Sequence, residues 1–422
     1  MTDQRLSPVW HPFMQHALRP HLPIVTHAEG AYLTTGDGRR VLDAISSWWV
    51  STHGHRHPRI VAAVKAQLET LDQVIFAEFT HRAAETVAER LISLTAPGLA
   101  HVFFSDSGST SVEVALKMAL VYWHNIGEPR RRIVVMEHSY HGDTVGTMSV
   151  GARSVITAAY EPLLFDVAQV PFPAIGREEA TFTALDALCR AGDIAAFIVE
   201  PLVLGAGGML MYSAAVLAEM ARICASRGVL FIADEVMTGW GRTGSMFACQ
   251  QAGVTPDIAC YSKGLTGGLL PLAATLCRPE IFAAHWSTDR RRTFFHSSSY
   301  TANPLACAAA AENIAMWEDE PVLARFADLA VLQARQLDRF REDRRFANVR
   351  QTGTITAMDI AVPDDGYLAA VGPPLHASFQ AAHILLRPLG NTVYVMPPYC
   401  VTAEDLAAIY EAIGAAADLV CR

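Results

Sequence analysis

The stretch VLFIADE, residues 229–235, decides the fold together with DIACYSKG, residues 257–264. In each stretch an apolar run typical of a buried strand leads to a charged residue, Asp234 in the first and Lys263 in the second. If the two strands are parallel, their carboxyl ends lie at the edge of the sheet where ligands bind. Apolar surroundings lower the pKa of a lysine, so Lys263 is a candidate Schiff-base amine. The alternative is a solvated lysine at a strand end.

Strands and helices alternate along the middle of the chain. Apolar runs of strand length recur, and other segments have the three- and four-residue apolar spacing of helices. This alternation predicts βαβ units and an α/β fold with a mostly parallel sheet covered by helices. The predicted strands are 101–104, 133–136, 195–199, 229–233, 257–260 and 272–276.

The two ends of the chain predict a second, smaller α+β domain. Residues 31–38 have the pattern of a strand and a hairpin turn with a D-G signal. Beyond an alanine-rich helical stretch, residues 303–339, strand and helix patterns alternate again. Because 422 residues exceed the usual length of one domain, we expect a large domain of residues 51–310. The small domain would be built from residues 1–50 and 311–422.

Composition argues against several classes of protein. The net charge is −9 and no basic run exceeds three residues, so nucleic acid is not an expected partner. Eight cysteines without a C-x-x-C pair argue against a zinc site or a disulfide framework and fit a cytoplasmic protein. The 18 uncharged residues 201–218 include three glycines, so no membrane span is expected there. The first 13 residues contain no apolar stretch of the kind found in secretory signals.

A candidate phosphate site follows the first predicted strand. Thr110 and Glu113 have the spacing of a capping box, which predicts a helix N-terminus directly behind Gly108 and Ser109. The free N–H groups and the dipole of such a terminus favour an anion. An ordinary capped helix after a tight turn is the alternative.

Aromatic and acidic side chains follow other strands. Tyr140 and Asp143 come after the second predicted strand, and Glu200 ends the third. A ligand with a phosphate, a planar ring, a basic ring nitrogen and a carbonyl group would use the phosphate site together with Tyr140, Asp234 and Lys263. Pyridoxal 5′-phosphate has all four features.

At this point the chain resembles the class III aminotransferases, which are pyridoxal phosphate-dependent transferases of fold type I. The resemblance extends from Trp10 to Tyr399, nearly the whole chain. The motifs shared with the class are Asp106-Ser107-Gly108-Ser109, Tyr140-His141-Gly142, Ala233-Asp234-Glu235-Val236, Gly241-Arg242-Thr243-Gly244 and Ser262-Lys263. Residues 46–49, 303–310 and 387–390 resemble the branch that aminates 8-amino-7-oxononanoate in biotin biosynthesis.

The resemblance implies how the cofactor would be held and used. Lys263 would form the imine with pyridoxal phosphate and shuttle the α-proton in a ping-pong reaction. Asp234 would pair with the ring nitrogen and Tyr140 would stack on the ring. Gly108 and Ser109 would hold the phosphate. No metal is implied.

The resemblance also implies a homodimer with the active site at the subunit interface and small-molecule substrates. Ser298 and Ser299 would reach the phosphate of the partner subunit's cofactor. Arg387 would bind the carboxylate of the keto acid in a bidentate salt bridge. Asp143 would lie near the amine donor. The residues expected to contact substrates are Trp48, Tyr140, Asp143, Lys263, Ser297 and Arg387.

The sequence departs from the family pattern at two places. Ser297-Ser298-Ser299 stands where the best-known members have Gly-Pro-Thr, and serine keeps a hydroxyl donor. Phe13 stands where they have tyrosine, so a hydroxyl near the expected donor pocket is missing. The implied donor is S-adenosyl-L-methionine, with lysine, another ω-amine or a broader ω-transaminase activity as alternatives. A non-enzymatic binding subunit of the same fold is a further alternative, against which the intact Asp234 and Lys263 argue.

Other motifs suggest rival functions. Residues 239–244 match G-x-G-x-x-G after a strand, but no helix pattern follows them, so a dinucleotide site is not expected. His53, His55 and His57 occur in an irregular turn without a carboxylate or cysteine, so packed or capping histidines are expected in place of metal ligands. No G-x-S-x-G motif supports a serine hydrolase.

Overall fold

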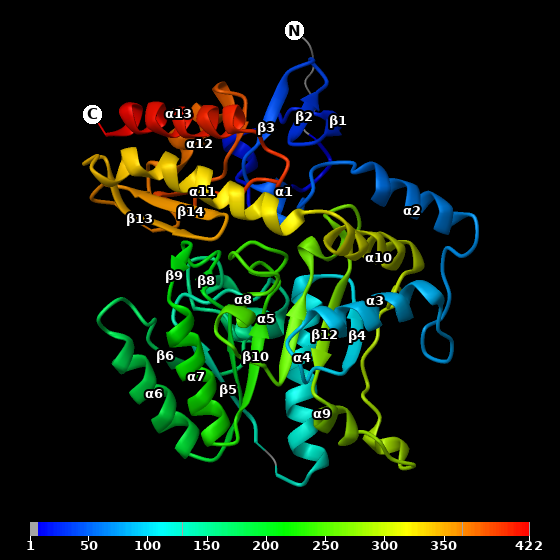
Figure 1. Ribbon diagram of the computed structural model, residues 1–422. Helices are drawn as coiled ribbons and strands as arrows, with labels where there is room; N and C mark the ends of the chain where they lie inside the picture. Colours follow the sequence, from blue (N-terminus) through cyan, green and yellow to red (C-terminus); the bar gives the residue numbers. More distant parts are fainter. Residues whose placement is uncertain (1–6, 129, 365, 422) are drawn as a thin grey trace.

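The computed structural model describes residues 7–128, 130–364 and 366–421 (Figure 1). A large sheet with its helices occupies the lower half of the view, and both ends of the chain lie in the upper half beside two smaller sheets. Residues 1–6, part of the segment in which no secretory signal is expected, lie outside the described residues.

The large sheet has seven strands. It is mostly parallel, as predicted, because β10 pairs in parallel with β7 and β11, and β5 with β7 and β6. Among its described strands, β12 runs antiparallel to both of its neighbours, β11 and the edge strand β4. The strands in spatial order are β4 (His101–Ser105), β12 (Ala273–Cys277), β11 (Ile258–Tyr261), β10 (Leu230–Asp234), β7 (Ile194–Val199), β5 (Arg132–Met136) and β6 (Ala168–Val170).

The direction of β12 follows from the length of its connection. Residues 262–272 join β11 to β12 and contain only the short 3-10 turn η3 (Lys263–Thr266). A parallel connection needs about a dozen residues or more, usually with a helix, and so this link returns the chain antiparallel. The interpretation of residues 272–276 as a further βαβ strand is wrong in this respect.

Helices cover both faces of the large sheet. Phe197 pairs with Phe231 and Ile198 with Ile232, and successive residues of a strand point to opposite faces. The two phenylalanines belong to the same buried cluster as α7 (Ala214–Ser226), and the two isoleucines pack in a second cluster with α4 (Gly108–Asn125). The sheet is therefore buried on both sides, and its ligand-binding edge is where the strands end.

The chain ends form the two smaller sheets. The first joins β1 (Val25–Glu29), β2 (Tyr32–Thr35) and β3 (Arg40–Asp43) to β15 (Ile384–Leu385), which pairs in parallel with β3. The second contains β13 (Phe346–Thr352), β14 (Ile355–Ile360) and β16 (Thr392–Val395). Pairing of β3 with β15 brings the N-terminal hairpin beside the C-terminal part. The domain division at residues 51–310 stays a prediction.

The remaining elements connect these sheets. The alanine-rich stretch is two helices, because Glu320 is extended before Pro321, as is usual for a residue that precedes proline. The short strands are β8 (Val203–Leu204) and β9 (Leu210–Met211). The other helices are α1 (Ser46–Trp49), α2 (Pro58–Leu68), α3 (Arg82–Leu94), α5 (Val145–Ser149), α6 (Glu178–Arg190), α8 (Ala248–Gln251), α9 (Pro279–Ala283), α10 (Pro304–Asp319), α11 (Val322–Arg341), α12 (Gly372–Ala381) and α13 (Ala403–Val420), and the 3-10 turns are η1 (His16–Leu18), η2 (Ala158–Leu163) and η4 (Arg290–Arg292).

The uncharged stretch 201–218 contains β8, β9 and the start of α7. Across the described residues, the structure has no helix of sufficient length and apolar character to cross a membrane.

The G-x-G-x-x-G stretch is a buried turn. Residues 239–247 contain no helix, and the next one, α8, has four residues. Gly241 has a φ of +84°, and a Cβ there would lie 2.8 Å from the ring of Phe326. Arg242 is buried and donates to the carbonyl oxygens of Pro397 and Ser51. Gly241 thus allows close packing between distant segments. The prediction that no helix opens directly after this motif is confirmed.

Candidate active site

Lys263 begins the turn η3 directly after β11, with a left-handed φ of +47°. The turn packs directly on Trp240 and leaves no room for a side chain at Gly264, because a Cβ there would lie 2.7 Å from the Trp240 ring. The side-chain amide of Asn313 donates to the carbonyl oxygens of Gly264 and Leu265, both at 3.0 Å. These contacts fix the direction in which Lys263 leaves the sheet.

The amine of Lys263 lies in a site that disfavours its charged form. Burial lowers the pKa of Lys263, while the negative charges of Asp234 and Glu200 oppose that shift. Its Nζ lies 5.0 Å from the centre of the Trp49 ring. A lowered pKa increases the fraction of neutral amine, which is the nucleophilic form.

Asp234 ends β10, beside β11 in the sheet, and its carboxylate is buried. One oxygen accepts from the backbone N–H of Val236 at 3.1 Å, and the other contacts Nδ1 of His141 at 2.6 Å. Because an ionised carboxylate only accepts hydrogen bonds, Nδ1 of His141 carries the proton. Nε2 of His141 is buried and has no hydrogen-bond partner among the described residues.

Glu200 accepts hydrogen bonds from the backbone of Tyr140 and of Gly205. One carboxylate oxygen accepts from the N–H of Tyr140 and the other from the N–H of Gly205, both at 2.9 Å. Burial raises the pKa of the Tyr140 hydroxyl well above its usual range, and the neighbouring charge of Asp143 adds to that shift. The hydroxyl of Tyr140 is therefore a hydrogen-bond donor at neutral pH.

The helix that follows β4 begins earlier than predicted. Ser107, not Thr110, is the N-cap, and the capping box joins Ser107 to Thr110. The prediction of a Thr110–Glu113 box is wrong because the carboxylate of Glu113 accepts from the hydroxyl of Thr144 and the N–H of Gly146. The shift leaves Gly108 within the first helical turn.

The first turn of α4 keeps the properties of an anion site. The N–H groups of Gly108 and Ser109 belong to that turn, where no carbonyl four residues earlier in the helix can accept from them. The hydroxyl of Ser109 accepts from the N–H of Asp143 at 3.3 Å. A Cβ on Gly142 would lie 2.1 Å from that hydroxyl oxygen, so glycine is required for this approach. The segment with Tyr140 and Asp143 thus packs directly on the helix start.

Arg387, Trp48 and Phe13 form a second cluster. The guanidinium carbon of Arg387 lies 5.3 Å from the centre of the Trp48 ring, and Nη2 donates to the carbonyl oxygen of Phe13 at 2.6 Å. The rings of Phe13 and Trp48 are 5.8 Å apart in an edge-to-face arrangement. Trp48 is 43 % exposed, so one side of its ring is open to a ligand.

The serines of residues 297–299 lie close to the start of α4 in the same chain. The hydroxyl of Ser298 donates to Asp106 at 3.1 Å. The carbonyl oxygen of Ser299 accepts from the side chain of Gln73 at 2.6 Å, and Ser297 and Ser299 are exposed. Contact of Ser298 and Ser299 with a partner subunit's cofactor stays a prediction, as does contact of Ser297 with substrate.

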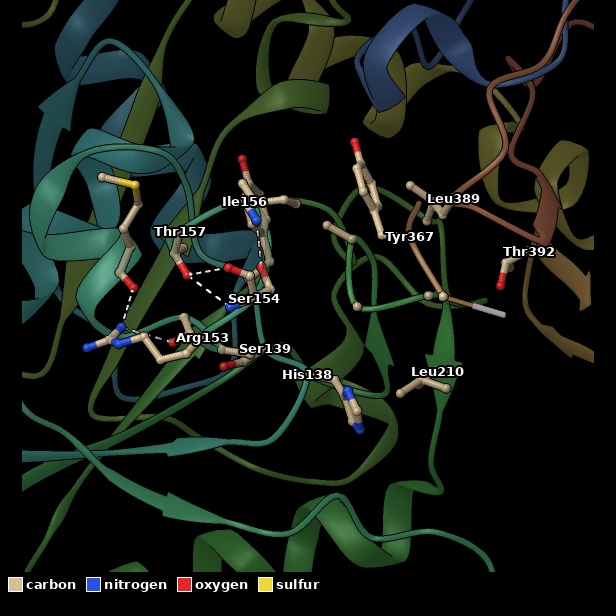
Figure 2. Close-up of a pocket in the computed structure, with 18 of the residues that line it drawn as sticks. His138, Ser139, Arg153, Ser154, Ile156, Thr157, Leu210, Tyr367, Leu389 and Thr392 are labelled. Atoms are coloured by element: carbon tan, nitrogen blue, oxygen red, sulfur yellow. Dashed lines mark hydrogen bonds between the residues drawn. The ribbon is translucent and has the colours of Figure 1, made fainter. Parts of the chain in front are cut away.

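A cavity of about 470 Å³ opens beside Tyr140 and Asp143. Figure 2 shows Arg153, Ser154 and Ile156 on one side of it and Tyr367, Leu389 and Thr392 on the other. The cavity therefore lies between the large sheet's loops and segments of the C-terminal part of the chain.

The side chains of His53, His55 and His57 have different surroundings. His55 contacts the carboxylate of Asp43 at 2.9 Å, and His53 packs edge-on against Trp317. His57 occupies the N-cap position of α2. Among the described residues no group of three or more His, Cys, Asp or Glu side chains is arranged to hold a metal ion.

The residues present fit pyridoxal 5′-phosphate. The first turn of α4 leaves N–H groups for a phosphate, and Asp234 offers a buried carboxylate to a ring nitrogen. Lys263 supplies an amine that desolvation makes nucleophilic. Asp234 and Lys263 sit at the ends of neighbouring parallel strands, as the sequence predicts.

Two contacts of this site were not predicted from the sequence. These are the hydrogen bond from His141 to Asp234 and the support of the Tyr140 backbone by Glu200. The only signal was that His141 follows Tyr140 directly and that Glu200 ends a strand. Their pairing depends on which strands lie beside each other.

Glu200 gives the fold a pH dependence. Burial, with the charge of Asp234 adding to it, raises the pKa of Glu200 from 4.5 to about 7. The folded protein then keeps a proton that the unfolded chain releases, so its free energy of unfolding falls as pH rises from about 4.5 to 7. Glu200→Gln removes this titration. Between pH 5 and 8 the wild type should lose about 3 kcal/mol relative to the variant.

Urea unfolding of both apoproteins at several pH values measures this difference. Glu69→Gln, which changes an exposed carboxyl, is the matched control and should leave the pH dependence as it is in the wild type. Parallel curves for the wild type and Glu200→Gln would show that Glu200 does not titrate in this range.

Comparison with known proteins agrees with the geometry of the site. The family model for class III aminotransferases matches residues 13–417. An adenosylmethionine-8-amino-7-oxononanoate aminotransferase from Synechococcus elongatus is 46 % identical over 413 residues, which cover 96 % of this chain and 97 % of the relative. A protein of the same name from Helicobacter pylori is 35 % identical, covering 95 % of this chain and 94 % of the relative.

Solved structures show the same fold. An adenosylmethionine-8-amino-7-oxononanoate aminotransferase from Methanocaldococcus jannaschii superposes with a TM-score of 0.92 at 31 % identity, covering 97 % of each chain. An amine transaminase from an uncultivated Pseudomonas species, solved with pyridoxal phosphate bound, gives a TM-score of 0.92 at 32 % identity, covering 98 % of this chain and 99 % of the other. The protein belongs to the class III aminotransferase family, whose members use pyridoxal 5′-phosphate.

Proposed function

We propose that this aminotransferase transfers an amino group from S-adenosyl-L-methionine to 8-amino-7-oxononanoate, a step of biotin biosynthesis. The observation that carries the proposal is the similarity over 96 % of the chain to a relative named for this reaction. In the overall exchange the amino nitrogen moves from the donor to the keto carbon of the acceptor, and the donor becomes a keto compound. The products are 7,8-diaminononanoate and the keto form of the donor.

Bound pyridoxal phosphate supplies an aldehyde that condenses with amines and a ring that accepts electrons from the bonds being broken. Lys263 has the role of proton carrier, because the η3 turn fixes its backbone and desolvation favours the neutral form of its amine. Asp234 provides a negative charge at the end of β10, and the hydrogen bond from Nδ1 of His141 orients its carboxylate. The catalytic residues of this proposal are thus Lys263 and Asp234, together with Tyr140, whose ring would stack on the cofactor.

Arg387 and Trp48 suit the keto acid. The guanidinium offers paired N–H donors to a carboxylate, and its contact with the Trp48 ring limits how it can turn. The open side of that ring offers apolar surface to the carbon chain of the acid. The cluster therefore selects a substrate with an apolar chain and a terminal carboxylate.

Tyr140 and Asp143 suit the amine donor. The Tyr140 hydroxyl stays protonated, and the exposed carboxylate of Asp143 lies near it, beside the 470 Å³ cavity. A cationic donor gains from a carboxylate at the mouth of the site. Phe13, which has no hydroxyl, packs against Trp48 in the other cluster, so donor discrimination depends on the groups near Tyr140 and Asp143.

The donor is tested by a half-reaction screen. Purified holoenzyme is mixed with each candidate amine in the absence of keto acid, and the change in cofactor absorbance is followed. We expect a saturable reaction with S-adenosyl-L-methionine and none with lysine. Phe13→Tyr is the matched variant, which restores the hydroxyl of the best-known members. Because Phe13 also packs against Trp48, its effects on the donor and on the keto acid are measured separately. If lysine or simple amines react, S-adenosyl-L-methionine is not the specific donor, and the proposed donor is wrong.

We further propose a cytoplasmic homodimer with the active site at the subunit interface. Large apolar side chains that are exposed in the single chain support the dimer, and they include Trp10, Trp286 and Phe295, at 90 %, 78 % and 70 %. Phe295 lies in the segment that leads to Ser298. Sedimentation equilibrium tests this: a mass near 46 kDa, that of one chain of 45.8 kDa, would contradict it.

A further inference from the structure

Asp43, at the end of β3, has a side chain with no exposed surface. Its carboxylate contacts four groups. One oxygen accepts from the N–H of Ile45 at 3.2 Å, and the other from the N–H of Ser47 at 2.6 Å and its hydroxyl at 3.3 Å. The second oxygen also contacts Nε2 of His55 at 2.9 Å. Since the carboxylate only accepts, Nε2 carries the proton.

Ile45 and Ser47, two of the residues that Asp43 binds, lie in the turn of residues 45–49, which contains α1 and whose backbone at Ser47 and Trp48 is not helical. Ser46, Ser47 and Trp49 have left-handed φ values of +52°, +59° and +67°. Such values are uncommon for residues other than glycine and persist only where the surroundings enforce them. The turn therefore depends on the groups that bind it.

The opposite side of the turn is bound to β16 and the residues after it. The hydroxyl of Ser46 donates to the carbonyl oxygen of Met396 at 2.9 Å, and the indole N–H of Trp49 donates to the hydroxyl of Tyr394 at 3.0 Å. His55 is itself held by two backbone hydrogen bonds to Gly30, at 2.7 and 3.3 Å. Hydrogen bonds therefore hold the turn on two sides. On one side the partners are neutral groups of Tyr394 and Met396, and on the other side the partner is the carboxylate of Asp43, which also contacts His55.

The turn presents two rings to the active site. Trp48 is 43 % exposed beside Arg387 and Phe13, and Trp49 is buried with Lys263 Nζ 5.0 Å from its ring. Because the two tryptophans are consecutive, a change of backbone at Ser47 moves both rings. The conformation of this turn therefore sets the position of the Trp48 ring relative to Arg387.

We propose that Asp43, together with His55, is a positioning residue that fixes the Trp48 ring for the keto acid. The inference rests on the proposed function, in which Trp48 and Arg387 bind that substrate. Asparagine at position 43 keeps one oxygen acceptor but places an N–H₂ group against donors of Ser47 or His55. The left-handed turn then loses an acceptor and relaxes, and the Trp48 ring leaves its place beside Arg387.

The kinetic test compares KM for the keto acid with the rate of the donor half-reaction. Asp43→Asn should raise that KM about tenfold, which corresponds to the loss of a hydrogen bond to a charged group. The donor half-reaction rate should stay within about twofold. His55→Ala should act in the same direction, and His55→Gln, which keeps a side-chain N–H donor, should restore much of the loss. Asp37→Asn, in an exposed turn of the same sheet, is the matched control.

A second measurement observes the turn without cofactor or substrate. Apoprotein labelled with 5-fluorotryptophan is examined by ¹⁹F NMR, with the signals of Trp48 and Trp49 assigned through Trp48→Phe and Trp49→Phe. Asp43→Asn and His55→Ala should shift both signals, and Asp37→Asn neither. Because His55→Ala removes only one of the four contacts of Asp43, it keeps the test usable if Asp43→Asn does not fold.

The outcomes separate the inference from the proposed function. Unchanged ¹⁹F signals and unchanged KM in the Asp43 and His55 variants would overturn the positioning role. If those signals shift but Trp48→Ala leaves the KM of the keto acid unchanged, the turn is positioned by Asp43, and the proposed substrate contact of Trp48 is wrong. If the signals shift in Asp43→Asn and His55→Ala, and if these two variants and Trp48→Ala all raise the KM of the keto acid, the positioning role and the substrate contact of Trp48 are both supported.

Discussion

Lys263→Ala should lower the rate of amino transfer by about four orders of magnitude or more, the upper range for loss of a group that transfers protons. The chain has three lysines, Lys65, Lys117 and Lys263, and Lys263 begins the turn after β11, the strand that pairs with β10 and Asp234. Removing it takes away the amine that we propose carries the proton at the reacting carbon. No other lysine is available at that strand end, so the activity should not be recovered from within the chain. Steady-state rates with saturating cofactor and both substrates measure the loss.

The control for this prediction is Lys65→Ala, which removes an exposed lysine of α2 and should leave the rate unchanged. Borohydride reduction of the holoprotein, followed by peptide mass mapping, gives an independent result because only three lysine-containing peptides are possible. The label should be found at Lys263 and be absent from the Lys263→Ala protein. A label at Lys65 or Lys117, or near-normal activity of the variant, would show that the central assignment is wrong.

The sequence predicts the large sheet well because its strands are buried on both faces. Continuous apolar runs such as those of β7 and β10, bounded by glycines and polar residues, are typical of strands buried on both faces. A charged residue at the end of such a run then lies at the ligand-binding edge, and this places Asp234 and Lys263 together. Short strands with mixed composition, such as β6 and β15, were not predicted because two or three residues carry no periodicity.

The helix start at residues 107–110 shows a limit of local patterns. Ser107 and Thr110 both have the residue type of an N-cap, and Glu113 completes a box for Thr110. The structure uses Ser107, because Glu113 finds better partners in Thr144 and Gly146, which are more than 30 residues away. A capping preference is of the order of 1 kcal/mol, so a contact made by the tertiary fold is enough to change it.

Contacts between distant residues could not be predicted from the pattern at all. The hydrogen bond between His141 and Asp234 joins residues 93 positions apart, and that between Tyr140 and Glu200 joins residues 60 positions apart. The four contacts of Asp43 are closer in sequence, but they depend on left-handed values at serine and tryptophan that residue type does not suggest. The residues proposed to carry the chemistry are thus visible in the sequence, and the contacts that orient them are visible only in the fold.

Arg387→Ala should raise KM for the keto acid about 100-fold while changing the donor half-reaction little, because a charge-assisted hydrogen bond contributes about 1.5–3 kcal/mol. The guanidinium of Arg387 stands over the Trp48 ring and donates to the carbonyl oxygen of Phe13. These contacts leave the rest of its planar donor set for a carboxylate. Separate titrations of keto acid and donor measure the two effects.

Two variants distinguish a shaped carboxylate site from a general positive charge. Arg19 lies near enough to Arg387 for the two charges to repel, and that repulsion, after burial, lowers the pKa of Arg19. If charge alone attracts the keto acid, Arg19→Ala should raise its KM about as much as Arg387→Ala, and Arg387→Lys should restore binding. If the paired donors of the guanidinium are needed, Arg19→Ala has a small effect and Arg387→Lys recovers only part of the loss. We expect the second result, because contact with Trp48 fixes the plane of the guanidinium and lysine has no plane to fix.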